Sequence, residues 1–208
     1  AYADLMTGFG DKGQEIYQVL GNYSTSEDWG VRLGIKYEER DGTHENITDG
    51  TELNNREDLM VRLGVQNDWS DRLRTQILLQ YGSSDSFYGV VPVDPDNRSN
   101  DVEIDQVEQN SRNDQDISNL RGALRLEYDL SDSLMLTSIT SYFDSEAIGI
   151  PFDADTFTAR VLEFEEPADF EYLSQEFRLN GQSDAFDWFI GASIRTEEVS
   201  TNTQLRYS

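Results

Sequence analysis

The sequence predicts an all-β protein, an antiparallel transmembrane β-barrel of about eight strands in four hairpins that is part of a larger barrel. Three observations lead to this fold class. Apolar and polar residues alternate with a period of two over long stretches. Short turns alternate with long connections along the chain, so that all the long connections fall on one side. Tryptophan and tyrosine residues bracket the aliphatic middle of several strands.

The clearest strands are those whose two faces differ in polarity. In the first of them, Val31, Leu33 and Ile35 occupy one face, and Arg32 and Lys36 occupy the other. The same alternation recurs further along the chain, and several segments are rich in β-branched and aromatic residues, which favour strands. The clear segments are residues 29–39, 58–69, 72–81, 120–129 and 187–195.

Weaker alternation completes the set of strands at residues 15–24, 134–143 and 172–180. Their faces are mixed, so the inward and outward sides are less clearly assigned. Helical spacing fits none of the eight segments as well as a period of two does. We therefore expect strands in these segments too.

The connections divide into two kinds. Within hairpins, short turns at residues 24–28, 70–71, 131–132 and 182–184 combine serine with an acidic residue, which suits tight-turn geometry. Between hairpins, long loops run over approximately 40–55, 82–116 and 144–170. Loops longer than ~15 residues are uncommon in compact soluble domains. We expect a single partial β-barrel domain over residues 1–208, with short periplasmic turns and long extracellular loops.

Aromatic residues locate the expected lipid boundary on both sides. Tryptophans sit close to the short turns, tyrosines sit close to the long loops, and Val, Leu and Ile lie between them. Two aromatic girdles around an apolar band are typical of outer-membrane barrels. The candidate girdle residues are Trp29, Trp69, Trp188, Tyr37, Tyr81 and Tyr142.

Composition narrows the class of partner. The formal net charge is -25, with 41 acidic and 16 basic residues, which argues against binding nucleic acid. Cysteine is absent, which excludes disulfides, thiolate metal sites and thiol nucleophiles. The apolar runs are far shorter than the ~20 residues of a spanning helix. A β-barrel fits such a polar sequence because only alternate residues face lipid.

Basic residues gather on the strand face opposite the aliphatic rows, whereas acidic residues fill the loops. A charged, water-filled lumen explains this separation better than a soluble sandwich or a lipocalin-like barrel does. Two roles remain open: attraction of anionic cargo, or ion pairs with the inward acids Glu38, Asp58, Glu127, Glu176 and Glu197, or with acids of a plug. The second is favoured. The candidate lumen-facing residues are Arg32, Lys36, Arg62, Arg74, Arg121, Arg125, Arg178 and Arg195.

Catalytic and metal sites find little support in the sequence. His44 is the only histidine and cysteine is absent, so a transition-metal centre and a Ser-His-Asp triad are not expected. The acidic stretches 92–105 and 163–169 lack the glycine and glutamate spacing of an EF-hand and are expected to be solvated loops. Such loops offer a weak hypothesis of divalent ions that bridge lipopolysaccharide phosphates. No enzyme activity and no cofactor are expected.

Two stretches carry a family resemblance. The first is VRLGIKYEERDG at residues 31–42, followed by Asn46, LNNRED at 53–58 and VRL at 61–63. The second is SQEFRL at 174–179, followed by DWFIGA at 187–192. In this order they resemble barrel strands of the TonB-dependent outer-membrane receptors, in which a strand often ends in Tyr-x-x-Arg-Asp-Gly before an Asn-containing loop. The order of the motifs is more specific than any one of them.

The resemblance implies a role in uptake of a scarce nutrient, such as a ferric siderophore or an oligosaccharide, across a bacterial outer membrane. In that family a plug blocks the barrel, loops capture substrate, and energy arrives through the TonB complex. The plug and TonB box are not seen here, and such barrels have about 22 strands. Ser208 replaces the usual terminal aromatic residue. The chain is therefore expected to be one section of a receptor, surrounded by outer-membrane lipid and lipopolysaccharide.

Two alternatives stay open. The first is a complete eight-stranded outer-membrane barrel with a structural or adhesive role, which an even number of strands permits. The second is a soluble secreted β-barrel domain that binds a ligand. The sequence does not identify the cargo.

Overall fold

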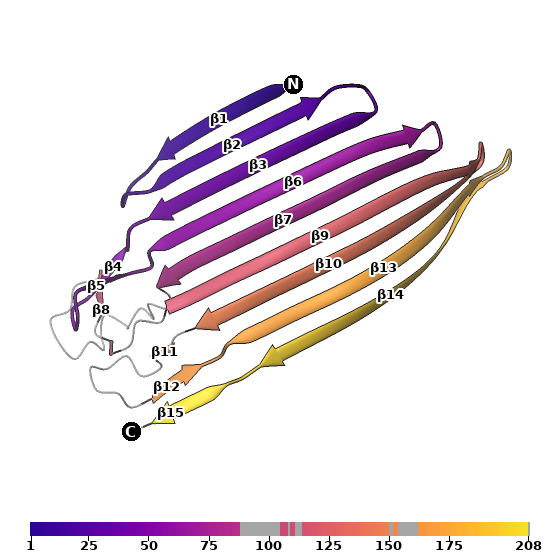
Figure 1. The fold of residues 1–208 in the computed structure, drawn as a ribbon. Helices are drawn as coiled ribbons and strands as arrows, with labels where there is room; N and C mark the ends of the chain where they lie inside the picture. Colours follow the sequence, from indigo (N-terminus) through magenta and orange to yellow (C-terminus); the bar gives the residue numbers. More distant parts are fainter. Residues whose placement is uncertain (88–104, 108, 111–113, 150–151, 154–161, 208) are drawn as a thin grey trace.

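The computed structural model describes residues 1–87, 105–107, 109–110, 114–149, 152–153 and 162–207. Nine long strands of these residues form one sheet: β1 (Tyr2–Phe9), β2 (Glu15–Ser24), β3 (Trp29–Arg40), β6 (Arg56–Ser70), β7 (Leu73–Phe87), β9 (Asp114–Ser131), β10 (Leu134–Gly149), β13 (Ala168–Gln182) and β14 (Asp187–Thr201). Each strand pairs antiparallel with its neighbour along the chain, as Figure 1 shows. The all-β antiparallel prediction is confirmed.

One strand of this sheet, β1, is not among the predicted eight. Both of its faces carry apolar residues, Leu5 and Phe9 on one and Tyr2 and Met6 on the other, so it lacks the contrast that reveals a strand. Strand β1 joins the sheet through backbone pairing with β2. Its turn to β2 is short although it lies at the same end as the long loops, so the division of connections by side is incomplete (Figure 1).

The strands also extend further toward the loops than the alternation indicates. Strand β7 continues six residues beyond Tyr81 to Phe87, and β9 begins at Asp114 rather than near 120. Beyond Tyr81 both faces of β7 become polar as far as Ser86, as the pair Ser83–Ser118 on one face and the pair Ser86–Gln115 on the other illustrate. The backbone ladder continues there without hydrophobic contrast, which sequence patterns cannot detect. The long connections are therefore shorter than predicted and comprise residues 41–55, 88–113 and 150–167.

Short strands form two small sheets at the loop end of the molecule (Figure 1). In one, β4 (His44–Asn46) lies between β5 (Thr51–Leu53) and β8 (Gln106–Val107). In the other, β12 (Leu162–Glu165) lies between β11 (Phe152–Asp153) and β15 (Gln204–Tyr207). Each small sheet brings together segments that are distant in the sequence, which no local pattern predicts.

The large sheet is a single open layer without a core. Among the described residues, Leu53 is the one hydrophobic side chain that is fully buried, and it lies in a loop strand. Strands β1 and β14 stand at the two edges of the sheet and are not paired with each other in the part of the chain that the structure describes. A complete eight-stranded barrel is therefore not formed by these residues.

Candidate functional site on the basic face of the sheet

The strand register sorts side chains onto two faces. Leu33 is paired with Leu63, and Leu63 with Leu79, so the three form a row across β3, β6 and β7. Directly paired residues of antiparallel strands point to the same side. The row is flanked by Val65 and Ile77, which are also paired, and we name this side the aliphatic face.

The opposite side, which we name the basic face, carries all eight basic residues that the sequence grouped together. Arg62, for example, is paired with Gly34 on β3 and with Gln80 on β7. Gln80 is paired with Arg121 on β9. The other members follow the same register: Arg32, Lys36, Arg74, Arg125, Arg178 and Arg195. Their exposure to a barrel lumen is not decided by the register and stays a prediction.

Most of these cations are ion-paired. Lys36 Nζ lies 2.8 Å from Glu38, and Arg195 lies 2.8 Å from Glu197. Five pairs join residues two apart on one strand, because side chains at that spacing share a face. They are Lys36–Glu38, Arg56–Asp58, Arg125–Glu127, Arg178–Glu176 and Arg195–Glu197, while Arg74 reaches Asp129 at 3.2 Å. The structure therefore contains the expected ion pairs for Glu38, Glu127, Glu176 and Glu197, whereas Asp58 pairs with Arg56, which lies outside the predicted set.

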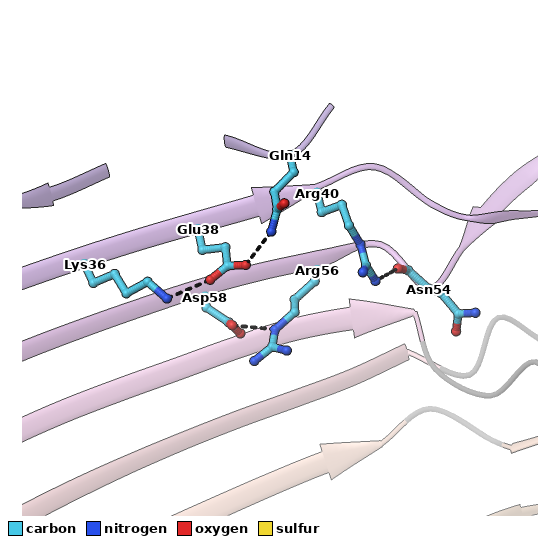
Figure 2. Close-up of polar contacts among 7 residues, drawn as sticks. All are labelled: Gln14, Lys36, Glu38, Arg40, Asn54, Arg56 and Asp58. Atoms are coloured by element: carbon cyan, nitrogen blue, oxygen red, sulfur yellow. Dashed lines mark hydrogen bonds and ion pairs between the residues drawn. The ribbon is translucent and has the colours of Figure 1, made fainter. Parts of the chain in front are cut away.

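A polar network marks the loop end of the basic face. Figure 2 shows the side-chain amide of Gln14 and the ammonium of Lys36 pointing toward the carboxylate of Glu38. Gln14 Nε2 donates a hydrogen bond of 2.9 Å to this carboxylate. Arg40 donates a hydrogen bond of 2.9 Å to the backbone carbonyl of Asn54, in the following loop (Figure 2). These contacts tie the β1–β2 turn and the first long loop to the end of β3.

Like charges stand opposite each other in this network. Glu38 is paired across the strands with Asp58, and Arg40 with Arg56. Like charges directly opposite each other destabilise a sheet. The intrastrand ion pairs Lys36–Glu38 and Arg56–Asp58 offset the repulsion between Glu38 and Asp58.

Three cations of the basic face make no ion pair with a described residue. Within the described residues, no carboxylate lies within ion-pair distance of Arg32, Arg62 or Arg121. The guanidinium of Arg121 instead lies over the ring of Phe143, 4.8 Å from its centroid. The ion-pair role therefore accounts for only part of the predicted set.

Sequence reasoning missed an aromatic cluster on the same face, formed by Phe143, Phe170 and Tyr172. The ring centroids are 5.5 to 6.0 Å apart. The guanidinium of Arg195 lies 4.3 Å from the centroid of Tyr172. Phe143 and Tyr172 are paired across β10 and β13, both of which have mixed faces in the sequence. Phe170 and Tyr172 share a face because they are two residues apart on β13, whereas only the register brings Phe143 to them.

The six candidate girdle residues lie on the aliphatic face. Trp29 and Trp69 lie at the short-turn ends of β3 and β6, and Trp69 Nε1 donates a hydrogen bond of 3.0 Å to Thr75. Toward the loops, Tyr81 is paired with Val61. The register places the remaining three, Tyr37, Tyr142 and Trp188, on the same side. Their contact with lipid stays a prediction.

The first two long loops are clipped together by a buried asparagine. Asn46 is 1% exposed, and its side chain donates to the backbone oxygen of Gln109 at 3.0 Å. The same side chain accepts hydrogen bonds from the backbone N–H groups of Gln109 and Thr48, each at 3.2 Å. Strand β4 also runs parallel to β8 beside this contact. The described parts of these two loops therefore form one unit at the loop end of the sheet.

His44 and the acidic stretches are the residues that the sequence offered for a metal or catalytic centre. No group of three or more His, Cys, Asp or Glu side chains suited to a metal ion occurs among the described residues. His44 contacts Thr43 at 2.9 Å and Asn54 at 3.3 Å. Much of the acidic stretch 92–105 lies outside the described residues. In the part of the chain that the structure describes, no helix has the length and apolar character needed to cross a membrane.

Comparison with known proteins finds similar structures but no similar sequence. No protein-family model and no curated protein matches the sequence. The structure, however, is similar to the siderophore receptor PiuA from Acinetobacter baumannii, with a TM-score of 0.73 and 15% identity over 96% of this chain and 30% of that one. The chain has the fold of a section of receptor barrel.

Other receptors show the same likeness. The ferric yersiniabactin uptake receptor FyuA from Yersinia pestis gives a TM-score of 0.73 at 12% identity, over 98% of this chain and 32% of that one. The ferric-catecholate import receptor Fiu from E. coli K12 gives 0.73 at 11% identity, over 96% and 32%. The chain thus spans about a third of the length of the receptors it matches. These neighbours are receptors for uptake, not enzymes.

Proposed function

We propose that this chain is a section of the barrel wall of a TonB-dependent receptor in the outer membrane of a Gram-negative bacterium. The observation that carries the proposal is the uncovered aliphatic face. Leu79 is 46% exposed and Ile194 is 69% exposed, in a sheet whose fold is that of receptor barrels. Burying apolar surface is the main driving force of folding in water, and a single layer does not supply it.

Lipid is the environment that suits the aliphatic face. Its rows of Val, Leu and Ile are bordered by tryptophans at one end and tyrosines at the other, the arrangement found at the two interfaces of a bilayer. A soluble ligand-binding barrel would instead turn such rows inward. The exposed rows therefore favour the membrane over the soluble alternative.

Water is the environment that suits the basic face. The side chains of its ion pairs are between 18% and 57% exposed, and the desolvation cost of such pairs is smallest where solvent reaches them. In a barrel of many strands the inward side lines a wide aqueous interior. We therefore assign the eight basic residues to the lumen and the girdle residues to the lipid interfaces.

Such a barrel wall takes part in the transport of a substrate that is not chemically changed. In the receptor family that the sequence resembles, loops capture substrate, a plug closes the barrel and the TonB complex supplies energy. The clipped loops of residues 44–55 and 105–110 would stand at the extracellular mouth. A ferric siderophore is the first candidate for the cargo, because the structurally similar PiuA is named a siderophore receptor and FyuA is named a ferric yersiniabactin uptake receptor. An oligosaccharide is the second.

The decisive experiment is deletion of the full-length gene in its own host. Under iron limitation, the mutant is expected to lose growth on one or more ferric siderophores and to regain it with the gene restored. An oligosaccharide as sole carbon source tests the second cargo. Fractionation should recover the protein in the outer membrane, with faster gel mobility before boiling than after. Recovery as a soluble periplasmic protein, or unchanged growth on every iron source and sugar, would contradict the proposal.

A further inference from the structure

We propose that the aromatic cluster of Phe143, Phe170 and Tyr172, together with Arg121 and Arg195, forms a binding site for an anionic ligand that carries a flat ring. The site lies on the basic face near the loop ends of β10 and β13. The inference deepens the proposed function and rests on it, because cargo reaches this face only if it lines the lumen. Five side chains from four strands build the site.

The rings offer an accessible apolar shelf. Phe143 and Tyr172 are tilted by 32° with centroids 5.5 Å apart, so they present nearly parallel faces. Phe170 meets Tyr172 edge-on, at 68° and 6.0 Å. All three are only partly buried in this single layer. A structural aromatic core would be covered by a second layer, whereas these rings retain surface on which another ring can stack.

Two guanidinium groups frame the shelf. Arg121 lies over Phe143, and Arg195 lies over Tyr172. Arg195 is also ion-paired with Glu197, whereas Arg121 has no carboxylate within ion-pair distance among the described residues. A guanidinium that lies over a ring keeps its edge N–H groups for a planar anion, which it binds in bidentate fashion. Arg121 is therefore the expected anchor for the ligand's charge.

A second arginine, Arg62, lies in the same row of paired residues as Arg121 and the rings. In the register, Arg62, Gln80, Arg121, Phe143 and Tyr172 follow one another across β6, β7, β9, β10 and β13. Adjacent strands are ~4.8 Å apart, so Arg62 and Arg121 stand roughly 10 Å apart on either side of Gln80. Arg62 also lacks a carboxylate partner within the described part of the chain. A ligand with more than one anionic group thus meets two free cations.

This combination selects one chemical class. A small aliphatic anion gains from the arginines but leaves the rings unused, and an uncharged sugar leaves the cations unused. A ring-bearing anion, such as an aryl carboxylate or a phenolate chelate, uses both. Stacking against Phe143 and charge-assisted bonds to Arg121 then act on the same ligand.

Equilibrium binding to the full-length receptor in detergent tests the site. The probe is iron(III) complexed with 2,3-dihydroxybenzoate, and iron(III) citrate is the ring-free anion. The aryl complex should bind more tightly than citrate. Phe143→Leu and Arg121→Gln should each weaken its binding roughly tenfold. Phe143→Tyr, which keeps the ring, should retain it.

Matched controls separate the site from general effects. Phe177→Leu removes a ring from the aliphatic face of β13, and Arg125→Gln removes a cation of β9 that is already paired with Glu127. Both should leave binding within twofold of the unchanged receptor. Equal binding of the two probes, absence of aryl binding, or normal binding by Phe143→Leu would overturn the site. Unchanged growth of the deletion mutant on every iron source and sugar would instead overturn the proposed function.

Discussion

Single residues on the two faces experience opposite environments, although they are neighbours in the chain. Leu63 is paired with Leu33 and Leu79 in the middle of the aliphatic face. Three residues away, Gln66 is paired with Gly30 and Gln76 on the basic face. A charge added at these two positions therefore distinguishes lipid from water directly.

We predict that Leu63→Arg destabilises the full-length protein by about 2–4 kcal/mol, the cost of arginine near the bilayer midplane. Gln66→Arg is the matched control and should change stability by less than ~0.5 kcal/mol, as polar surface substitutions do. Chemical unfolding in lipid vesicles, followed by tryptophan fluorescence, measures both. Equal effects of the two substitutions would show that the aliphatic face does not contact hydrocarbon.

The hairpin of β13 and β14 depends on a glycine that lies beneath an indole ring. Gly181 is paired with Trp188, and the ring covers it so closely that a Cβ at 181 would collide with the indole. Gly21 lies on the same face, yet a Cβ there would meet no atom within 4 Å. The two glycines are chemically identical but differ in their surroundings.

We predict that Gly181→Ala displaces the Trp188 ring and costs about 1–3 kcal/mol through overpacking. In a full-length background in which every other tryptophan, Trp29 and Trp69 included, is replaced by phenylalanine, the emission of Trp188 should shift. Gly21→Ala should leave both stability and emission unchanged. An unshifted spectrum for Gly181→Ala would show that the ring does not rest on this glycine.

The paired loops form another element whose stability depends on one side chain. Asn46 makes three hydrogen bonds within a buried environment, two of them to Gln109, which lies 63 residues further along the chain. Removing a buried partner leaves backbone groups unsatisfied, which is costly. The neighbouring Ile47 contributes backbone pairing, but its side chain is 42% exposed.

For Asn46→Ala we expect loss of about 1–3 kcal/mol from the loop unit, because buried backbone groups lose their partners. Amide hydrogen exchange should accelerate at residues 44–53 and 105–107 but not in the large sheet. Ile47→Ala serves as the control and should leave exchange unchanged. Uniform acceleration across the sheet would contradict an independent loop unit.

On the scale of the whole molecule, the described sheet has two long edges. Strands β1 and β14 each pair on one side only, and β14 exposes Ile190 and Ile194 along its length. An unpaired edge is a template for association with another strand. A barrel removes such edges by closure.

We therefore predict that a polypeptide of residues 1–208 alone does not form a monodisperse monomer in detergent, whereas the full-length receptor does. Size-exclusion chromatography with light scattering distinguishes the two. A stable monomer of residues 1–208 would show that the sheet closes on itself, and it would favour a small complete barrel.

Patterns of alternation predicted much of this architecture, and their failures have physical causes. Segments 29–39 and 58–69 became strands because their faces differ in polarity, and Arg32 and Arg62 share a face as expected. Strand β1 was missed because its faces are similar. The loop ends of β7 and β9 were missed because polar residues dominate both faces there. Phe143, by contrast, lay in a predicted strand, but its neighbours did not follow from the pattern.

Which residues share a face follows from the amino-acid order alone, because a period of two fixes orientation within each strand whatever the strand pairs with. Which residues meet across strands follows from the fold. Arg121, Phe143 and Tyr172 come together through register alone, and Asn46 reaches Gln109 through pairing between loops. Register depends on backbone bonds and turn geometry summed over many strands, which no single segment encodes.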